Sequence, residues 1–210
     1  MTNQIELKTD PYNLIITGVG GQGNVLASRM IGNMLSGKGL FVTIGETFGA
    51  SQRGGSVMSH LRISAKSSYS PQIAKGQAHM IVAMEPTEAI RVMATYGNPD
   101  VAVLCNTRPI QSVGVIAGEV NYPSLDEIRQ MVNELSASSW FINATDTAME
   151  EMGNPIFGNI MLLGALAATG ELPLPRDEFE SVISRDMSAD KVETNLKAYD
   201  MGMEMIGGAA

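Results

Sequence analysis

The chain has 210 residues, with 14 lysines and arginines against 22 aspartates and glutamates, and its formal net charge at pH 7 is −8. Such an acidic chain repels the phosphates of nucleic acid, which argues against a nucleic-acid-binding protein. Residues 1–8 lack the basic start and apolar core of a signal peptide, and no apolar run approaches the ~18 residues that span a bilayer. We therefore expect a cytoplasmic protein with neither nucleic-acid nor membrane contacts.

Cys105 is the single cysteine, so an internal disulfide, a structural zinc site or an iron–sulfur cluster ligated by this chain alone is excluded. It ends the apolar run 101–104, which indicates a buried strand residue. His60 and His79 are the only imidazoles. We expect no metal site on this chain.

Short apolar runs alternate with segments of helical periodicity, which is typical of an α/β layer fold. The pattern predicts strands over residues 12–17, 40–45, 56–63, 79–84, 101–105 and 139–144. A first helix is predicted to end at Gly37, and a second to lie between Pro86 and Gly97. Ser124 begins a capping box, which predicts a third helix behind it.

The C-terminal third changes character, because residues 156–168 are apolar nearly all round, as expected of a helix buried on most sides. Gly158 and Gly164 within it predict close packing against a neighbour. Two further helices are predicted after Pro175 and Asp190. We predict a three-layer α/β/α fold with a mostly parallel, Rossmann-like sheet and a helical C-terminal tail. Residues 1–11 would be an N-terminal extension and residues 12–210 a single domain.

A glycine-rich turn, residues 18–23, directly follows the first predicted strand and opens the first predicted helix. Its candidate contact residues are Gly18, Gly20, Gly21, Gln22 and Gly23. Glycines allow positive φ, which we expect at Gly20, and let a ligand or another backbone approach closely. The alternative is that these glycines only let the helix pack tightly against the sheet.

The turn matches the G-x-G-x-x-G pattern, for which a dinucleotide site also requires an acidic residue at the end of the second strand. Glu46 lies near that position. NAD or another adenine-containing ligand therefore remains an open alternative at this point.

A second glycine-rich segment lies between the second and third predicted strands. Its candidate binding residues are Gln52, Arg53, Gly54, Gly55 and Ser56. A guanidinium beside bare backbone N–H groups suits the capture of a phosphate or carboxylate. The alternative is a surface turn with a solvated arginine. On the strand that follows, His60 and Arg62 share one face and would converge with Arg53 on an anion or a partner, unless that face is an ordinary half-exposed strand surface.

These segments resemble the gamma-type domain of the 2-oxoacid:acceptor oxidoreductases, in particular its indolepyruvate-specific members. The likeness rests on the glycine turn, on Glu46 to Ser56 and on the run from Ser59 to Arg62. Residues 84–89, 122–123, 159–164 and 195–198 follow in the same order. The resemblance covers residues 12–203. Asn24, Phe48, Ala50 and His79 depart from the family's usual residues, which leaves the choice of 2-oxoacid open.

The resemblance implies a reaction that this chain does not perform alone. In that family an arylpyruvate such as indolepyruvate is decarboxylated on thiamine diphosphate, the acyl group passes to coenzyme A, and electrons pass through iron–sulfur clusters to ferredoxin. This sequence has neither the thiamine diphosphate motif nor a cysteine-rich ferredoxin motif. Thiamine diphosphate, Mg²⁺ and the 4Fe–4S clusters are therefore expected on a larger partner subunit. This chain would dock on it and contribute to coenzyme A binding, with no catalytic residue of its own.

Two other classes stay open. A free-standing Rossmann NAD-dependent dehydrogenase would need a general acid or base, and no pair of suitable residues stands out. A non-catalytic module that binds an adenine ligand would bind it tightly without turnover.

Overall fold

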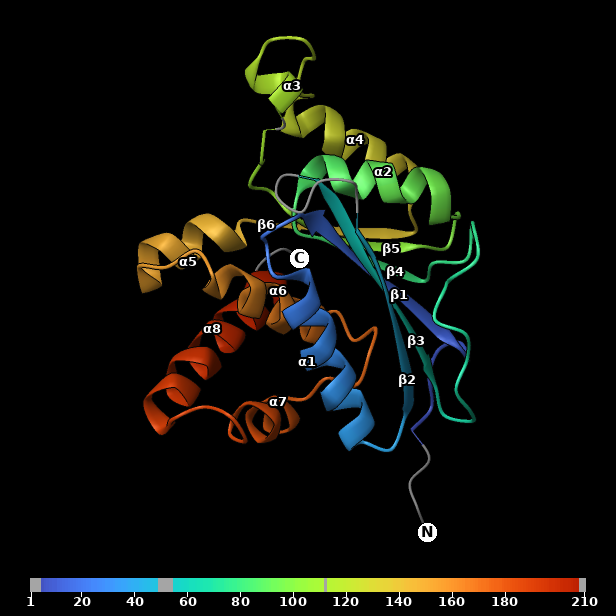
Figure 1. Cartoon of the computed structure of the whole chain (residues 1–210), viewed down its shortest axis with the longest axis vertical. Helices are drawn as coiled ribbons and strands as arrows, with labels where there is room; N and C mark the ends of the chain where they lie inside the picture. The colour runs from blue at the N-terminus through green and yellow to red at the C-terminus, as the bar shows by residue number, and fades with distance from the viewer. Residues whose placement is uncertain (1–4, 49–54, 112, 208–210) are drawn as a thin grey trace.

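The structure is a computed structural model that describes residues 5–48, 55–111 and 113–207. Its centre is one sheet of six strands in the order β2–β3–β1–β4–β5–β6 (Figure 1). The strands are β1 (Tyr12–Val19), β2 (Phe41–Phe48), β3 (Ser56–Ser64), β4 (Met80–Ala83), β5 (Ala102–Asn106) and β6 (Ser138–Ile142). Each of the six predicted strands is present, and their ends move by at most three residues.

The strands β1, β4, β5 and β6 are parallel neighbours, whereas β3 is antiparallel to both β1 and β2. Five strands therefore run in one direction and β3 runs in the other, which confirms a mostly parallel sheet. The sequence pattern did not reveal that β3 lies between β1 and β2. The position of β3 therefore determines which residues lie beside β1 at the edge that carries the glycine turn.

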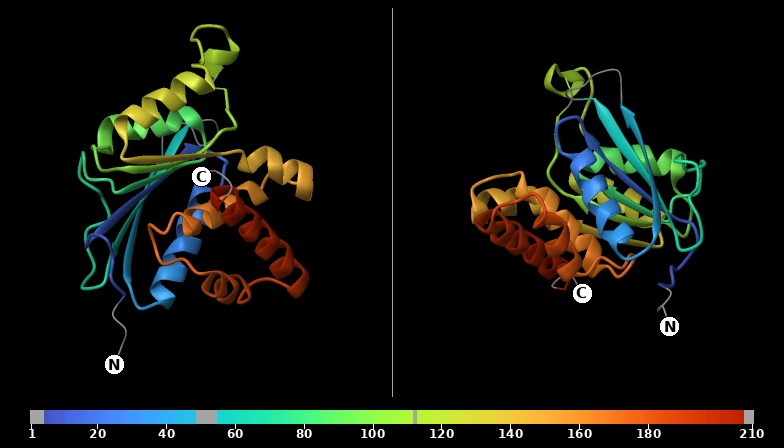
Figure 2. Two further views of the ribbon diagram at one scale, coloured as in Figure 1. Left: turned by 180° about the vertical axis from the view of Figure 1, so that it is seen from behind. Right: turned by 60° about the horizontal axis from the view of Figure 1, so that its bottom comes forward.

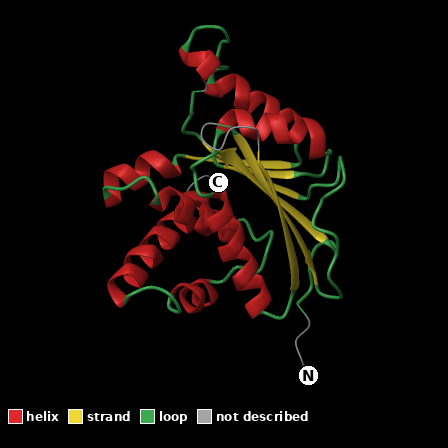
Figure 3. Ribbon diagram, viewed as in Figure 1, coloured by secondary structure: helices red, strands yellow, loops and turns green. Residues whose placement is uncertain are grey.

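Helices cover both faces of the sheet, which confirms the three-layer fold (Figure 3). One face carries α1 (Asn24–Gly37), α6 (Phe157–Ala168), α7 (Arg176–Ile183) and α8 (Ala189–Gly207), and the other carries α2 (Pro86–Tyr96) and α4 (Leu125–Leu135). The short α3 (Val113–Ile116) lies in a lobe that projects from the body, and α5 (Ala144–Met152) follows β6 (Figure 1). Cys105 is fully buried in β5, as expected.

The C-terminal helices pack closely on the α1 side of the sheet (Figure 2). A Cβ added at Gly164 of α6 would lie 2.0 Å from the carbonyl oxygen of Tyr199, and one at Gly202 of α8 would lie 1.9 Å from that of Met161. Glycine on each helix thus lets the backbone of the other approach, which confirms the close packing predicted for Gly164. Among the described residues, no helix combines the length and apolarity needed to cross a membrane.

Candidate functional site

The glycine turn lies between β1 and α1, at the edge where the parallel strands have their carboxyl ends. Gly21 and Gly23 have φ angles of 103° and 87°. A residue with a Cβ is strained in this region, so both positions favour glycine. Gly20 is not among the glycines with positive φ, so our expectation for Gly20 is wrong, and the conformational requirement lies at Gly21 and Gly23.

The side chain of Gln22 holds the turn from within. The backbone N–H of Val19 donates to its Oε1 at 2.7 Å, and its Nε2 donates to the carbonyl oxygen of Met84 at 3.0 Å. A Cβ at Gly18 would lie 2.6 Å from Oε1, so glycine there leaves room for this folded side chain. The backbone N–H of Gln22 also donates to the carbonyl oxygen of Val19 at 3.1 Å, so Gln22 braces the turn with both its side chain and its backbone.

Asn159, in the first turn of α6, fixes the other side of the same turn. Its Nδ2 donates to the carbonyl oxygen of Gln22 at 2.6 Å, and a Cβ at Gly23 would lie 2.5 Å from that nitrogen. The sequence placed Asn159 only within a run that resembles the family, without a role. The turn is therefore supported by β1, by the end of β4 and by α6.

The start of α1 is open to an anion. Gly23 supplies no side-chain cap, and the first N–H of α1 to bond into the turn is that of Ala27, which donates to Gly23 O at 3.1 Å. The N–H groups of Asn24, Val25 and Leu26 precede it and have no acceptor within the helix. With the positive end of the helix dipole behind them, they favour a phosphate or carboxylate.

Two pockets flank the turn, and Gly21 lines both. One, of about 290 Å³, lies between the turn, the start of α1 and Val57 of β3. The other, of about 340 Å³, lies toward Ile110, Thr145 and Ile156. Ile110 and Ile156 are 38% and 56% exposed, so this rim also presents apolar side chains to an approaching partner.

The start of β3 is tied to α2 beside the turn. The backbone N–H of Gly20 donates to Gly55 O at 2.8 Å, which brings together two of the predicted contact residues. The hydroxyl of Ser56 donates to Oε2 of Glu88, which also accepts from Nε of Arg91 at 2.9 Å. Ser56 is thus a bracing residue in this chain. No role was predicted for Glu88, although it lies in the Met84–Ala89 run that carries the resemblance.

A second carboxylate, Glu85, is fully buried at the end of β4. It caps α2 by accepting from the backbone N–H of Glu88 at 3.1 Å, and it accepts from the hydroxyls of Thr87 and Tyr122. Burial and the hydrogen bond to Glu85 raise the pKa of the Tyr122 hydroxyl far above its usual range. Burial likewise raises the pKa of the Cys105 thiol, which is therefore a poor nucleophile. Sequence patterns did not reveal this cluster, because Tyr122 lies 37 positions from Glu85 in the chain.

Glu46 does not occupy the position that the ribose-binding acid has in a dinucleotide-binding sheet. In such a sheet the second strand lies directly beside the first. Here β3 separates them, since Glu46 pairs with Ser59, and Ser59 in turn pairs with Ile16 of β1. Two strand spacings, about 9.5 Å, therefore separate Glu46 from β1. The dinucleotide role expected from spacing is wrong for this residue.

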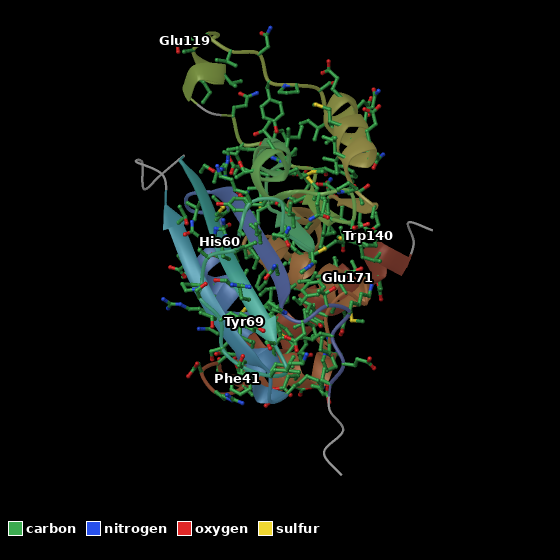
Figure 4. The ribbon with its side chains drawn as sticks, turned by 90° about the vertical axis from the view of Figure 1, so that its right-hand side faces the viewer. Phe41, His60, Tyr69, Glu119, Trp140 and Glu171 are labelled. Carbon is green, nitrogen blue, oxygen red and sulfur yellow. The ribbon has the colours of Figure 1, made fainter. Side chains whose placement is uncertain are left out.

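His60 and Arg62 lie away from the turn. Figure 4 labels His60 on β3. Its side chain is 1% exposed and packs edge-on against Tyr96 of α2, and burial lowers its pKa. Arg62 donates to Oδ1 of Asn13 at 3.2 Å and lies 4.9 Å from the ring centre of Tyr69. Six residues of strand, about 20 Å, separate Arg62 from Ser56. These two side chains therefore lie apart from the glycine turn, and their convergence with Arg53, which lies outside the described residues, stays a prediction.

Gln52, Arg53 and Gly54 lie outside the described residues, so their predicted roles stay predictions. Among residues 5–48, 55–111 and 113–207, no group of three or more histidine, cysteine, aspartate or glutamate side chains is arranged to hold a metal ion.

The fold and this edge define a class of protein. The family described as pyruvate ferredoxin/flavodoxin oxidoreductase matches residues 13–205, and the chain belongs to this family. It is 36% identical over 193 residues to indolepyruvate oxidoreductase subunit IorB of Pyrococcus horikoshii, covering 92% of this chain and 95% of that one. The chain is thus a subunit of an oxidoreductase of this family, which confirms the resemblance seen in its sequence.

Solved structures show the same fold. The gamma subunit of the keto/oxoacid ferredoxin oxidoreductase of Geobacter sulfurreducens matches with a TM-score of 0.66 and 23% identity, over 94% of this chain and 99% of that one. The 2-oxoglutarate:ferredoxin oxidoreductase of Magnetococcus marinus matches with a TM-score of 0.75 and 20% identity, over 97% of this chain but only 32% of that one. In that protein the fold is one part of a longer chain.

Proposed function

We propose that this chain is the small subunit of an indolepyruvate or other arylpyruvate oxidoreductase, which docks on a larger subunit and contributes to coenzyme A binding. The complex would convert the 2-oxoacid to its acyl-CoA, release carbon dioxide and pass two electrons to ferredoxin. The observation that carries the proposal is the braced glycine turn, which lies between two pockets, one of them lined by the open start of α1. The likeness to an indolepyruvate oxidoreductase subunit supports the choice of substrate.

The chemistry of the edge fits the phosphates of coenzyme A. The first N–H groups of α1, from Asn24 to Leu26, and the helix dipole attract an anion, and Gly21 leaves the backbone uncovered, since nothing lies within 4 Å of a Cβ built there. The Magnetococcus marinus oxidoreductase was solved with 2-oxoglutarate, coenzyme A and succinyl-CoA bound. Hydrogen bonds from Gln22 and Asn159 hold the turn within this chain.

The redox and decarboxylation chemistry belongs, in this proposal, to the larger subunit. Thiamine diphosphate with Mg²⁺ would supply the electron sink for decarboxylation, and iron–sulfur clusters would carry the electrons. Cys105 is the chain's single cysteine and is buried, so it offers no cluster ligation. The residues of this chain bind and orient coenzyme A at the edge where it enters, and they exclude water there.

A free-standing dehydrogenase fits the geometry less well. Glu46 is displaced by β3, and the two imidazoles are used elsewhere. His60 is buried against α2, and Nδ1 of His79 accepts from the backbone N–H of Asn13 at 2.9 Å, at the opposite end of the strands. Neither is available to a substrate at the glycine turn.

The test is anaerobic affinity purification of the tagged chain from its own cells, with identification of copurifying proteins. We expect one larger subunit that carries iron and thiamine diphosphate, and coenzyme A-dependent reduction of a dye or ferredoxin by indolepyruvate. The chain purified alone should be inactive. Recovery of the chain without a partner, together with NAD-dependent turnover by that chain, would contradict the proposal and favour a dehydrogenase.

A further inference from the structure

β2 is the outermost strand on one side of the sheet, and among the described residues it pairs with β3 alone. Its side chains at Val42 and Ile44 lie over Gly32 of α1, where an added Cβ would be 2.9 Å from Ile44 Cδ1. The face toward α1 is therefore covered. Figure 4 shows the strand from the side, with Phe41 at its beginning.

The direction of the backbone groups of β2 follows from the bonds of its neighbours. His79 N donates to Asn13 O at 2.9 Å and Met84 N donates to Thr17 O at 2.8 Å, so the odd-numbered residues of β1 direct their backbone groups toward β4. The even-numbered residues of β1 then bond to β3, because backbone groups alternate in direction along a strand.

The register between the strands extends this alternation from β1 to β3 and then to β2. Leu14 pairs with Leu61, so the odd-numbered residues of β3 bond to β1 and the even-numbered ones bond to β2. His60 pairs with Gly45, so the odd-numbered residues of β2 bond to β3. The N–H and C=O groups of Val42, Ile44 and Glu46 therefore point away from the sheet. Within the part of the chain that the structure describes, no other element provides backbone partners for them.

This edge lacks the features that usually prevent strand addition. β2 is eight residues long, contains no proline or lysine, and pairs residue for residue with β3 without a bulge. Its single charged side chain is the exposed Glu46. The opposite edge strand, β6, has only five residues and is the shorter template.

We propose that an extended segment of the larger subunit adds to β2 as a seventh strand, with a lysine or arginine close to Glu46. The inference rests on the proposed function, which supplies the larger subunit. Main-chain hydrogen bonds would join the segment to Val42, Ile44 and Glu46. The charge of the chain favours this occupant over a second copy, because two chains of −8 repel each other while a basic segment is attracted.

The first test is hydrogen–deuterium exchange on the isolated chain and on the purified complex. In the isolated chain the amides of Val42, Ile44 and Glu46 should exchange fast, and those of Thr43, Gly45 and Thr47 slowly, because only the latter are bonded to β3. In the complex the three outward amides should slow by about tenfold or more. Equal exchange of these three amides in both samples would overturn the inference.

The second test uses matched variants of the complex. Glu46→Pro removes an outward N–H and places a ring on the edge, and it should weaken binding to the larger subunit by about tenfold or more with little change in melting temperature. Glu46→Gln keeps the N–H and should weaken binding less, whereas Glu46→Lys should weaken it more than Glu46→Gln. Thr47→Pro removes a bond to β3 and should lower the melting temperature instead.

The outcomes separate this inference from the proposed function. If the wild-type chain does not copurify with a larger subunit, the proposed function fails and this inference fails with it. If the wild-type complex forms but Glu46→Pro binds as tightly as wild type, only the added strand is contradicted. If Glu46→Pro does not fold, the exchange data on the wild-type complex decide.

Discussion

Asn159 and Gln22 lie 137 positions apart in the chain and are joined by a 2.6 Å hydrogen bond from the Asn159 side chain to the Gln22 carbonyl oxygen. The bond links the start of α6 to the turn between β1 and α1. The candidate site is therefore shaped by the C-terminal helices as well as by the sheet. The buried helical tail predicted from the sequence thus supports the functional edge directly.

We expect Asn159→Ala to lower the free energy of unfolding by about 1–2 kcal/mol, because the carbonyl of Gln22 loses its donor. Asn195→Ala is the control, since Nδ2 of Asn195 donates to Lys191 O within its own helix and makes only a weak contact, at 3.6 Å, with the sulfur of Met187 just before that helix. The control should change stability by less than about 0.5 kcal/mol. Urea unfolding of the isolated variants measures both. Equal losses of unfolding free energy in the two variants would show that the hydrogen bond from Asn159 to Gln22 contributes no more to stability than one within a single helix.

Substitutions at Gly21 and Gly23 distinguish the cost of backbone strain from the cost of a steric conflict. At both positions a Cβ is strained by the positive φ, which costs about 1–2 kcal/mol. A Cβ at Gly21 meets nothing within 4 Å, whereas one at Gly23 meets Nδ2 of Asn159 at 2.5 Å. Gly23→Ala should therefore destabilise the chain more than Gly21→Ala.

The excess cost at Gly23 should disappear when Asn159 is also alanine, because the colliding group is then gone. A double-mutant cycle with Gly23→Ala and Asn159→Ala measures this coupling. Additive effects of the two substitutions would contradict the steric explanation.

The sequence predicted much of the fold, because strands such as residues 12–17 are apolar runs, and the cap at Ser124 and the proline at the first position of α2, Pro86, are local signals. It did not predict that β3 lies between β1 and β2. Local periodicity identifies a strand but carries no information about its neighbours in the sheet. For that reason Glu46 matches the sequence spacing of a dinucleotide-binding acid, although the strand order that such a site requires is absent.

The site was predicted in part. The glycine turn is where the sequence placed it, and the Gly20 to Gly55 bond joins the two glycine-rich segments. The bracing roles of Gln22, Asn159 and Glu88 depend on contacts between distant residues, which a single sequence does not reveal. His60 was misplaced because strand alternation identifies a face without showing what covers it.

The burial of His60 predicts a loss of stability in mild acid. Its pKa is lowered from the usual 6.5, so the folded state binds a proton less readily than the unfolded state. The contribution to stability is therefore complete above pH 6.5 and is lost as the pH falls from 6.5 toward the lowered value. His60→Phe keeps a ring against Tyr96 and removes the proton site.

We expect the melting temperature of the wild type to fall between pH 7.5 and about 5, and that of His60→Phe to fall less. His79, whose pKa is also lowered by burial, leaves a residual slope in the variant. Parallel pH profiles of the two proteins would contradict the assignment.

Arg53 and Arg62 are expected to affect different properties of the assembled enzyme. Arg53 stands among glycines in the sequence, where a guanidinium suits an anionic ligand, whereas Arg62 is bonded to Asn13 near the opposite end of β3. Arg53→Ala should raise KM for coenzyme A or weaken subunit binding by about tenfold, since the substitution removes the guanidinium that we expect to bind an anion. Arg62→Ala should lower the melting temperature and leave both quantities unchanged. Steady-state kinetics on the purified complex measure KM for coenzyme A, and subunit titration measures the affinity between the subunits. If both are unchanged in Arg53→Ala, Arg53 does not belong to the binding site.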